Sequence, residues 1–595
     1  MNNKKYENEL YSGPYIETLK DIVTDTVAAH PDHPAYMYRD AHREPFRSVT
    51  FREFDEMRRA LGTSLLDMGL KGSNIAVAGE NSFRWALSYF TIATGAGVVV
   101  PIDKNLAIEE IENLLHRADV VLLFVSPKMA DKVMPSLDKV ESLRYIVIMD
   151  PPDLELTEYT ADERVCLQSE LIRKGKRLLS EGHRDYVDAE VEAEDLCTIL
   201  FTSGTTGLAK GVMLSHQNFA QNVFNMSKFF HIPENGRVLD VLPMHHAYEM
   251  TCTIMTCFYQ GATVVICEGL KHIQTNFEEM NCCIMLGVPL IFENMYRKIW
   301  KQAEKSGSKL KLERALALSK RLKLRNNRRA TERMFESIHK LFGKNFYMFI
   351  AGGAAIDPKV IADFEAMGFP MMQGYGMTEN APIIAMNSDR YGKAASAGRP
   401  LPGTEVRVVD KDENGIGEII CKGPSVMMGY YKDPENTAKT LRNGWLYTGD
   451  YGYMDEDDFI YITGRKKNVI VTKGGKNIFP EEVEYYLLLE PSVSETLVYG
   501  KHEDVKNDLL CTAIIYPNYE YMKEQHAESD EQIYEILSKA VDKANAKMPP
   551  YKRVRRIEVR DRDFVKTTTL KIKRFEDENY EYKFDDRTVH SGRRV

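Results

Sequence analysis

The sequence predicts an α/β protein, with a large N-terminal domain of stacked α/β layers, a β-rich subdomain and a smaller α+β C-terminal domain. Short apolar runs rich in β-branched residues alternate with helical stretches, a pattern typical of largely parallel sheets covered by helices. The clearest runs are Asn74–Ala78, Val120–Val125, Tyr145–Met149 and Thr263–Cys267. The sequence becomes β-rich near Gly403, and a separate α/β segment follows Arg465.

Two uncharged runs must be considered as possible membrane-spanning helices. Trp85–Ile102 is interrupted by glycine and proline, which predicts a helix ending near Ala93, a glycine turn and a strand at Val98–Val100. Thr251–Cys267 contains a glutamine and a glycine at its middle, which predicts a buried helix followed by a strand at Ala262–Ile266. Neither run is a convincing membrane span.

Length and composition narrow the class of protein. At 595 residues the chain is too long for one ordinary domain. Apolar residues make up 44% and charged residues 28%, as in soluble globular proteins, and the net charge of −9 argues against nucleic acid as a general partner. The cysteines lack metal-ligand spacing, and the N-terminus lacks the apolar core of a signal peptide, so we expect a reducing, cytoplasmic setting. Five cysteines in apolar surroundings are expected to be buried thiols: Cys252, Cys257, Cys267, Cys282 and Cys283.

A loop rich in serine, threonine and glycine follows the apolar run Leu196–Phe201. Glycine lets the backbone approach phosphate closely, N–H groups and hydroxyls donate to phosphate oxygens, and Lys210 adds a positive charge. The P-loop pattern G-x-x-x-x-G-K-[ST] does not fit, because Ala209 precedes the lysine and Gly211 follows it. Taken alone, such a loop is often only a surface turn. The predicted polyphosphate-binding residues are Thr202, Ser203, Gly204, Thr205, Thr206, Gly207 and Lys210.

Other motifs follow this loop in a fixed order: Gly374–Glu379, Tyr447–Asp450, Gly464–Arg465 and Thr567–Lys571. Together they resemble the adenylate-forming (AMP-binding) superfamily, and specifically the long-chain fatty acid–CoA ligase branch of the acyl-CoA synthetases. The resemblance implies a reaction in two steps. A carboxylate attacks the α-phosphorus of ATP to give an acyl-adenylate and pyrophosphate, and the thiol of coenzyme A then displaces AMP.

The resemblance also implies where the nucleotide binds. Thr378 would contact the α-phosphate and Glu379 would hold Mg²⁺, for which a carboxylate is a suitable hard ligand. Tyr375 would stack on adenine, Asp450 would accept hydrogen bonds from the ribose hydroxyls, and Arg465 would reach the ribose or phosphate. In isolation a Thr-Glu pair is usually a helix start, and an aspartate after glycine is a plain turn residue. The implied nucleotide-binding set is Gly353, Ala354, Ala355, Gly374, Tyr375, Gly376, Met377, Thr378, Asp450, Ile462 and Arg465.

Lys571 matches the catalytic lysine of the family, which bridges the carboxylate and the α-phosphate. Lys566 and Lys573 are rivals by charge alone, so the choice depends on the register of the motif. His246, the second of a histidine pair, aligns with the family histidine near the acyl carboxylate, although most histidines are structural or exposed. Gly474, Gly475 and Lys476 match the segment that lines the pantetheine tunnel of coenzyme A.

The resemblance supplies the interdomain hinge, with its pivot at Lys467, and makes the C-terminal domain mobile. The predicted division is an N-terminal domain over 1–464, with its β-rich subdomain at about 400–464, a hinge at 465–467, a C-terminal domain over 468–575 and a charged, loose tail over 576–595.

Residues 297–346 form a basic block, with sixteen Lys/Arg and four Glu in a chain that is acidic overall. Its leucines and other apolar residues suggest helices with one buried side. The simpler interpretation is a solvated helical insertion. The alternative is a basic patch that meets an anionic membrane surface.

The leading hypothesis is an ATP- and CoA-dependent ligase for a medium- or long-chain fatty acid. Acyl carrier protein as the acceptor, or an aryl or bile-type acid as the substrate, stays open. A catalytically inactive relative that binds nucleotide or acyl chains is a third hypothesis, but such a protein has little need for Lys210, Glu379, Asp450, Arg465 and Lys571 together.

Overall fold

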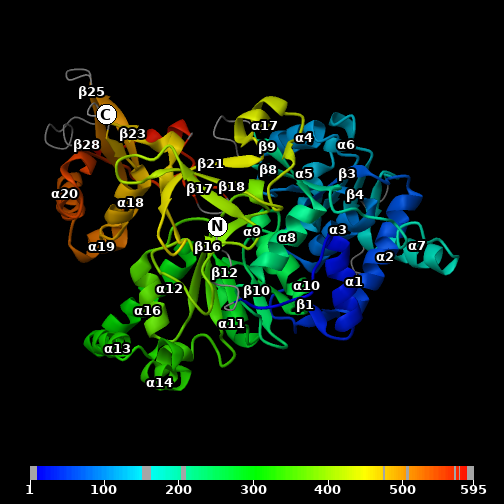
Figure 1. Cartoon of the computed structure of the whole chain (residues 1–595), viewed down its shortest axis with the longest axis horizontal. Coiled ribbons are helices and arrows are strands. Elements are labelled where there is room, and N and C mark those ends of the chain that lie inside the picture. The colour runs from blue at the N-terminus through cyan, green and yellow to red at the C-terminus, as the bar shows by residue number, and fades with distance from the viewer. Residues whose placement is uncertain are drawn as a thin grey trace. The chain divides into compact units, whose positions relative to one another are not determined.

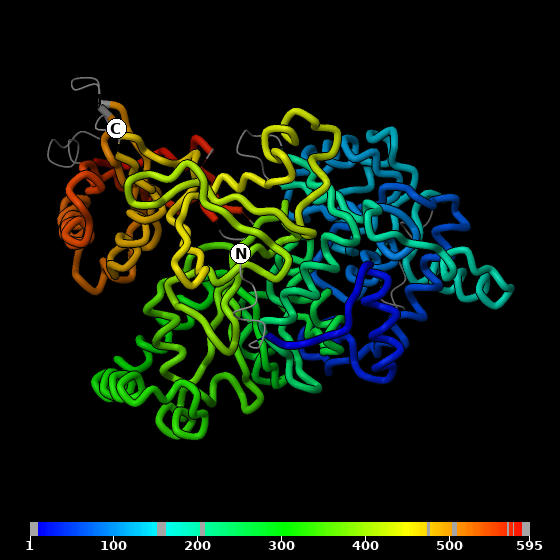
Figure 2. The backbone as a smooth tube through the Cα atoms, in the orientation of Figure 1, coloured from blue at the N-terminus to red at the C-terminus, as the bar shows by residue number. Residues whose placement is uncertain are grey.

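The computed structural model describes residues 10–150, 162–202, 209–472, 476–503, 508–567, 571–574 and 576–585. These residues form two compact units. The larger unit contains the described chain up to Val406 together with Cys421–Leu446, and the smaller unit contains Arg407–Ile420 and the chain from Tyr447 on. Figures 1 and 2 follow the chain from its blue N-terminal part to its orange and red C-terminal part.

The first sheet of the larger unit has eight strands, in the order β19 (Gly429–Tyr430), β9 (Lys210–Ser215), β8 (Leu196–Thr202), β4 (Gly97–Ile102), β3 (Ser73–Ala78), β5 (Leu122–Val125), β6 (Tyr145–Ile148) and β7 (Val165–Leu167). From β8 to β7 the neighbouring strands are parallel, and β9 runs antiparallel to β8 and to β19. Every residue of β5 is buried, as in a strand covered on both faces.

The second sheet has nine strands, in the order β16 (Arg399–Pro400), β15 (Ile383–Met386), β14 (Met371–Gly376), β13 (Met348–Ala351), β12 (Ile284–Gly287), β10 (Arg237–Asp240), β11 (Thr263–Ile266), β1 (Pro34–Tyr38) and β2 (Arg47–Thr50). The strands from β14 to β1 are parallel, and antiparallel strands close both edges. The predicted α/β class with largely parallel sheets is thus confirmed, and so are the four predicted strand runs.

The helices of the larger unit outside the basic block are α1 (Leu19–Ala29), α2 (Phe51–Asp67), α3 (Phe83–Thr91), α4 (Ile108–Arg117), α5 (Ala130–Val133), α6 (Ser136–Lys139), α7 (Gln168–Ser180), α8 (His216–Met226), α9 (Ala247–Glu249), α10 (Thr256–Tyr259), α11 (Ile273–Glu279), α16 (Pro358–Ala366) and α17 (Pro434–Thr440). Side-chain hydrogen bonds fix several helix starts: Thr50 and Glu53, for example, form a capping box at the start of α2.

An aromatic cluster joins α2, α3 and α10. The ring of Phe258 lies 4.9 to 5.0 Å from the rings of Phe51, Phe54 and Phe90. These side chains are buried, so the uncharged run that contains Phe258 is part of the protein core, as predicted. Among the residues that the structure describes, no helix is both long enough and apolar enough to cross a membrane.

The basic block contains the last part of α12 (Pro289–Lys305), followed by α13 (Lys309–Arg321), α14 (Arg328–Met334) and α15 (Glu336–His339). Helix α13 contacts α12 and α16, and α14 contacts α15; Figure 1 labels α12, α13, α14 and α16. Tyr296 of α12 and Lys320 of α13 both donate hydrogen bonds to Asp363, which ties these two helices to α16. The predicted burial of one helix side is only partly correct. Leu318 and Leu322 are 47% and 55% exposed, because α13 turns them away from α16.

A five-stranded sheet follows, in the order β17 (Glu405–Val409), β18 (Gly417–Lys422), β21 (Trp445–Met454) and β20 (Leu441–Arg442), with β22 (Ile460–Arg465) paired to β21. This sheet confirms the predicted change to β-rich structure after Gly403. The remaining strands are β23 (Ile470–Val471), β24 (Asn477–Ile478), β25 (Val493–Glu503), β26 (Asp508–Pro517), β27 (Arg556–Val559) and β28 (Phe584–Asp585), and the helices with them are α18 (Pro480–Leu488), α19 (Tyr519–Glu524) and α20 (Asp530–Ala546).

The segment predicted to be a loose tail from residue 576 begins with packed structure. Strand β28 pairs antiparallel with β27, and Asn579 is fully buried, with hydrogen bonds to the backbone of Val565 and Lys573. The prediction was wrong for 576–585, because it rested on the high overall charge of the segment, whereas only a few of its residues form the contacts that anchor it. Residues 586–595 lie outside the described part of the chain.

Candidate active site

The predicted phosphate loop connects two paired strands. Strand β8 ends at Thr202 and β9 begins at Lys210, and these two residues face each other across the antiparallel ladder. The ladder therefore fixes both ends of the loop at neighbouring positions. Ser203, Gly204, Thr205, Thr206 and Gly207 lie outside the described residues.

Lys210 and Glu379 meet around a tyrosine that the sequence analysis missed. Tyr430, on β19, donates a hydrogen bond to Glu379 (Oη–Oε1, 2.8 Å), and the Nζ atom of Lys210 lies 5.0 Å from the centroid of its ring. Burial, followed by the negative charge of Glu379, raises the pKa of Tyr430, so its hydroxyl stays protonated and remains a donor. One tyrosine thus contacts a cation over its ring and a carboxylate at its hydroxyl.

Glu379 lies in a short helical turn, Thr378–Asn380, that follows β14. The backbone N–H of Met427 donates to the carbonyl of Glu379 (2.9 Å), which fixes the turn against the segment before β19. The side chains of Thr378 and Glu379 are both half-buried. A carboxylate that is held but still reaches solvent can take a hydrated Mg²⁺ ion, which keeps several water ligands.

Tyr375 lies at the end of β14 between Gly374 and Gly376, and the backbone leaves no room for a side chain at Gly376. A side chain at Gly376 would place its first carbon 2.1 Å from the carbonyl oxygen of Pro382. Gly353 follows the neighbouring strand β13 with a φ of +83°, and it is exposed together with Ala354 and Ala355. Because β13 and β14 are parallel neighbours, all these groups lie at the same carboxyl edge of the sheet.

The histidine pair lies between β10 and α9. His246 precedes α9 and is half-buried, whereas His245 is buried, and the two ring centroids are 4.2 Å apart. His245 Nε2 lies 3.5 Å from Oδ2 of Asp103, a residue that follows β4. Burial acts to raise the pKa of Asp103, but the close approach and charge of His245 outweigh it and hold this pKa at about 2. Ionised Asp103 therefore holds His245, whose ring in turn packs against that of His246.

Two carboxyl groups are buried beneath this histidine loop. Asp240 ends β10, Glu249 ends α9, and neither side chain reaches solvent. Burial, and then the charge of Asp240, raises the pKa of Glu249 well above its usual value, so Glu249 is the neutral member of the pair. Its Oε1 atom accepts a hydrogen bond from the N–H of Val241 (3.3 Å).

Asn81 completes this buried network. Its amide nitrogen donates to both oxygens of Asp240 (3.0 and 3.1 Å) and to the carbonyl of Leu242 (2.6 Å). Its oxygen accepts from the N–H of Met244 (3.1 Å). Asn81 and Glu249 therefore hold both ends of the loop that carries His246. The sequence analysis did not select any of these groups, because the contacts join distant parts of the chain.

Asp450 and Arg465 form an ion pair in the smaller unit. They face each other on β21 and β22, with Arg465 Nε 2.8 Å from Asp450 Oδ1. Asp450 is buried, and its N–H donates to the hydroxyl of Thr448 (3.0 Å). Ile462 lies on β22 opposite Gly452 and is half-buried.

Ion pairs distinguish the three lysines of the C-terminal motif. Lys566 pairs with Glu495, and Lys573 lies 3.5 Å from Glu576. Among the described residues Lys571 has no carboxylate partner within ion-pair distance. Lys571 is exposed, but nearby protein still lowers its pKa to about 8 through desolvation and then the positive charge of Arg465, while Asp450 opposes the shift.

The segment predicted to be the hinge follows β22 directly. Lys466 Nζ lies 2.6 Å from the buried carboxylate of Glu418, and Lys467 is exposed. Lys476, predicted to line the coenzyme A tunnel, pairs with Glu413, and the hydroxyl of Thr472 donates to its backbone carbonyl (3.1 Å). Gly474 and Gly475 lie outside the described residues.

The structure thus gathers the predicted residues into separate sets. Lys210, Thr378 and Glu379 belong to one set in the larger unit, and Tyr375 and Gly353 belong to the carboxyl edge that leads to it. Asp450, Arg465 and Lys571 form the set of the smaller unit, where their charges act on one another.

Solved structures of other proteins share this fold. The anthranilate CoA ligase AuaEII in complex with anthranoyl-AMP superposes with a TM-score of 0.74 at 21% identity, over 95% of this chain and 98% of that one. The Mycobacterium tuberculosis fatty acyl CoA synthetase superposes with a TM-score of 0.61 at 22% identity, over 93% and 96%. Both share the architecture of a large α/β N-terminal domain and a smaller C-terminal domain.

The family follows from the sequence. The family model described as AMP-binding enzyme matches residues 23–431, and the model of the AMP-binding enzyme C-terminal domain matches residues 467–579. The chain therefore belongs to the AMP-binding, adenylate-forming enzymes. It is 26% identical to the chloroplastic long-chain-fatty-acid–[acyl-carrier-protein] ligase AEE15 of Arabidopsis thaliana, over 90% of this chain and 81% of the relative. It is 27% identical to the long-chain-fatty-acid–CoA ligase of Escherichia coli, over 81% and 83%.

Proposed function

We propose that this protein is an ATP-dependent ligase that activates a medium- or long-chain fatty acid and transfers the acyl group to coenzyme A. In the first step a carboxylate oxygen bonds to the α-phosphorus of ATP, and the bond to the departing pyrophosphate breaks. In the second step the thiol sulfur bonds to the acyl carbon, AMP leaves, and the thiol proton passes to solvent.

The observation that carries this proposal is the group formed by Lys210, Tyr430 and Glu379. A transfer at phosphorus needs a cation for the phosphates and an oxygen ligand for Mg²⁺, and catalysis of this kind is mainly positioning and electrostatic stabilisation. Lys210 fits the first need and Glu379 fits the second, with the 2.8 Å hydrogen bond from Tyr430 holding the carboxylate. When bound, Mg²⁺ would neutralise phosphate charge.

The other predicted residues take the remaining roles. Thr378 contacts the α-phosphate, Tyr375 stacks on adenine, and Asp450 accepts from the ribose. Lys571 draws the two anions together, a role that its lack of a carboxylate partner among the described residues supports. His246 positions the acyl carboxylate.

Acyl carrier protein is a second candidate acceptor, because a relative that matches 90% of this chain is named as a ligase for that acceptor. Adenylation is common to both proposals. An aryl or bile-type acid in place of a fatty acid would change only the acyl pocket.

The test is carboxylate-dependent exchange of pyrophosphate into ATP, measured without a thiol and with acids from acetate to oleate. Exchange that peaks with medium- or long-chain acids supports the proposal, and exchange with aryl acids alone would replace the substrate. If folded protein shows no exchange with any acid, the adenylation proposal fails. Product analysis with coenzyme A and with acyl carrier protein then identifies the acceptor.

We also propose a peripheral contact between the basic block and an anionic membrane. Leu310, Leu318 and Leu322 are 66%, 47% and 55% exposed on a face that also carries lysine and arginine. Such a face suits the boundary between anionic headgroups and acyl chains. Co-sedimentation with phosphatidylglycerol vesicles tests it, and equal recovery with neutral phosphatidylcholine vesicles would contradict it.

A further inference from the structure

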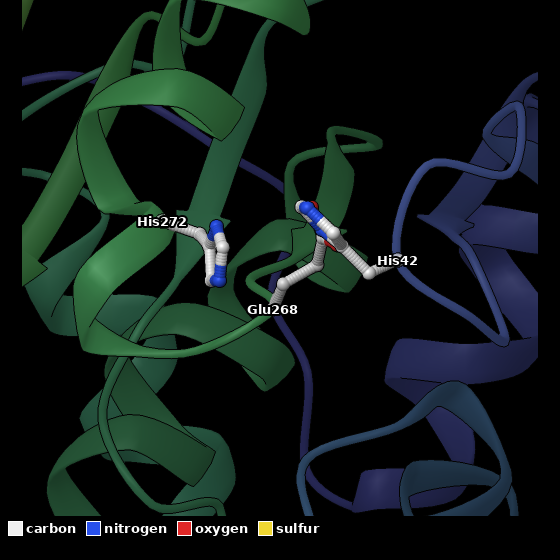
Figure 3. A group of neighbouring side chains, drawn as sticks. All are labelled: His42, Glu268 and His272. Carbon is white, nitrogen blue, oxygen red and sulfur yellow. The ribbon is translucent and has the colours of Figure 1, made fainter.

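Two histidines and a glutamate meet at the carboxyl edge of the nine-stranded sheet, on strands that carry none of the residues assigned above. His42 lies in the loop after β1, and Glu268 and His272 follow β11. Because β1 and β11 are parallel neighbours, both segments leave the sheet at the same edge. Figure 3 shows the three side chains gathered between the blue segment that carries His42 and the green segment that carries the other two.

The donor atoms are close enough for one ion. One ligand atom from each side chain lies within 4.8 Å of the others. His42 Nδ1 is 2.7 Å from Glu268 Oε1, and the centroids of the two imidazole rings are 4.8 Å apart at an angle of 46°. Two imidazole nitrogens and one carboxylate oxygen are a ligand set that zinc takes in proteins, with water in the fourth position.

The glutamate is held by a second layer of contacts. Its other oxygen, Oε2, accepts a hydrogen bond from the buried side chain of Asn276 (2.6 Å), while the oxygen of Asn276 accepts from the N–H of Glu268 (3.0 Å). This reciprocal pair leaves Oε1 directed at the histidines. Supporting contacts of this kind orient ligands and are typical of metal sites.

The charges near the three ligands favour binding of a cation. Arg39 lies 3.4 Å from Oε2 of Glu268, but it also pairs with Glu279 at 2.6 Å. Among these three groups two negative charges face one positive charge, so one negative charge is uncompensated. Arg39 approaches the oxygen that faces Asn276 and not the one that faces His42.

We propose that His42, Glu268 and His272 bind one divalent metal ion of the zinc type. The ion ties the loop after β1 to the segment after β11. This site shares no residue with the Mg²⁺ site expected at Glu379. The two sites also favour different metals, because Mg²⁺ prefers oxygen ligands in octahedral geometry, whereas two imidazoles favour zinc and its neighbours in the transition series.

The experiment titrates ZnCl₂ into tag-free, chelator-treated full-length protein in a calorimeter. One saturable site is expected. His42→Ala and His272→Ala should each abolish it, and because His42 is exposed its variant should fold. Asn276→Leu should weaken zinc binding about 10- to 100-fold, as expected for loss of a supporting contact. His183→Ala, which removes another exposed histidine, is the matched control and should bind as the unmodified protein does.

Thermal melting gives a second readout that is independent of catalysis. Zinc should raise the melting temperature of the unmodified chain and of the His183→Ala variant, but not that of His42→Ala, and MgCl₂ should not substitute for it. Absence of saturable zinc binding, or unchanged binding in both His42→Ala and His272→Ala, would overturn the proposal. Failure of adenylation alone would leave it intact.

Discussion

Replacing Glu249 tests whether the buried acid pair supports the histidine loop. The neutral carboxyl group of Glu249 shares a side-chain hydrogen bond with Asp240, in which Glu249 is the donor. In Glu249→Gln the amide is neutral like the protonated acid, so it can still donate to Asp240 and accept from Val241. In Glu249→Leu that donor is lost, and the carboxylate of Asp240 remains buried with only Asn81 as its hydrogen-bond donor among the contacts described above. The two variants have similar side-chain volumes, so they differ mainly in this hydrogen bond.

The expected difference follows from burial. Neither carboxyl group reaches solvent, so an unbalanced charge cannot be rehydrated without opening the loop. A hydrogen bond to a charged group contributes about 1.5–3 kcal/mol, and Glu249→Leu loses one such bond. We therefore expect Glu249→Leu to be less stable than Glu249→Gln by about 1.5–3 kcal/mol.

The pH dependence of stability tests separately whether Glu249 is neutral in the folded protein. The folded-state pKa of Glu249 is raised above its unfolded value, so its contribution is fully present below the unfolded pKa and is lost as the pH rises through the folded pKa. Glutamine has no proton to lose. Relative to the unmodified protein, the free energy of unfolding of the Gln variant should thus rise by up to about 1.4 kcal/mol per pH unit above about pH 4.3.

Thermal melting of the three proteins from about pH 5 to about pH 7 measures both effects, because titrating groups away from the pair cancel in the comparison. Burial raises the pKa of Asp240 to about 6, so this group titrates in the same window and is part of the measured difference. Equal stability of the Gln and Leu variants would refute the hydrogen bond to Asp240. A Gln-minus-native difference that stays flat with pH would refute the neutral state of Glu249.

Four further predictions concern catalysis. Lys571→Ala should slow adenylation at least about 100-fold, the scale of losing one electrostatic contact, but spare thioester formation from supplied acyl-adenylate; Lys573→Ala is the control, and equal loss in both steps would exclude the role. Since Lys571 is charged below its pKa of about 8, native adenylation should fall as the pH rises through about 8, and a flat profile in pyrophosphate exchange would contradict this. Tyr430→Phe should raise the Mg²⁺ concentration needed for half-maximal exchange, and an unchanged requirement would separate Tyr430 from Glu379. Lys467→Pro should stall one half-reaction, and normal rates in both would place the hinge elsewhere.

Much of the fold could be predicted because its signals are local. The strand at Val120–Val125 is a continuous apolar run, and the phosphate loop is a run of small and hydroxyl residues directly after another. Lys210 and Glu379 were selected because their motifs have a fixed order along the chain.

The remaining features depend on contacts that no local pattern records. Tyr430 is one of two adjacent tyrosines, and only the pairing of β19 with β9 brings it to Lys210 and Glu379. Asp240 and Glu249 resemble ordinary surface acids until the fold buries them. Leu318 shows the reverse: its apolar side chain predicts burial, but the packing of α13 leaves it exposed.

The antiparallel pairing of Thr202 with Lys210 has a consequence for how anions are attracted. In a P-loop the chain leaves the phosphates through a helix, whose N-terminus adds a partial positive charge. Here the chain leaves through strand β9, and strands have only small net dipoles. No helix end directly follows the loop, so the positive charge at its described ends comes from side chains: Lys210, and Arg117, which donates to the carbonyl of Ala209 (2.8 Å). Acetylation of Lys210 would remove one of these two charges.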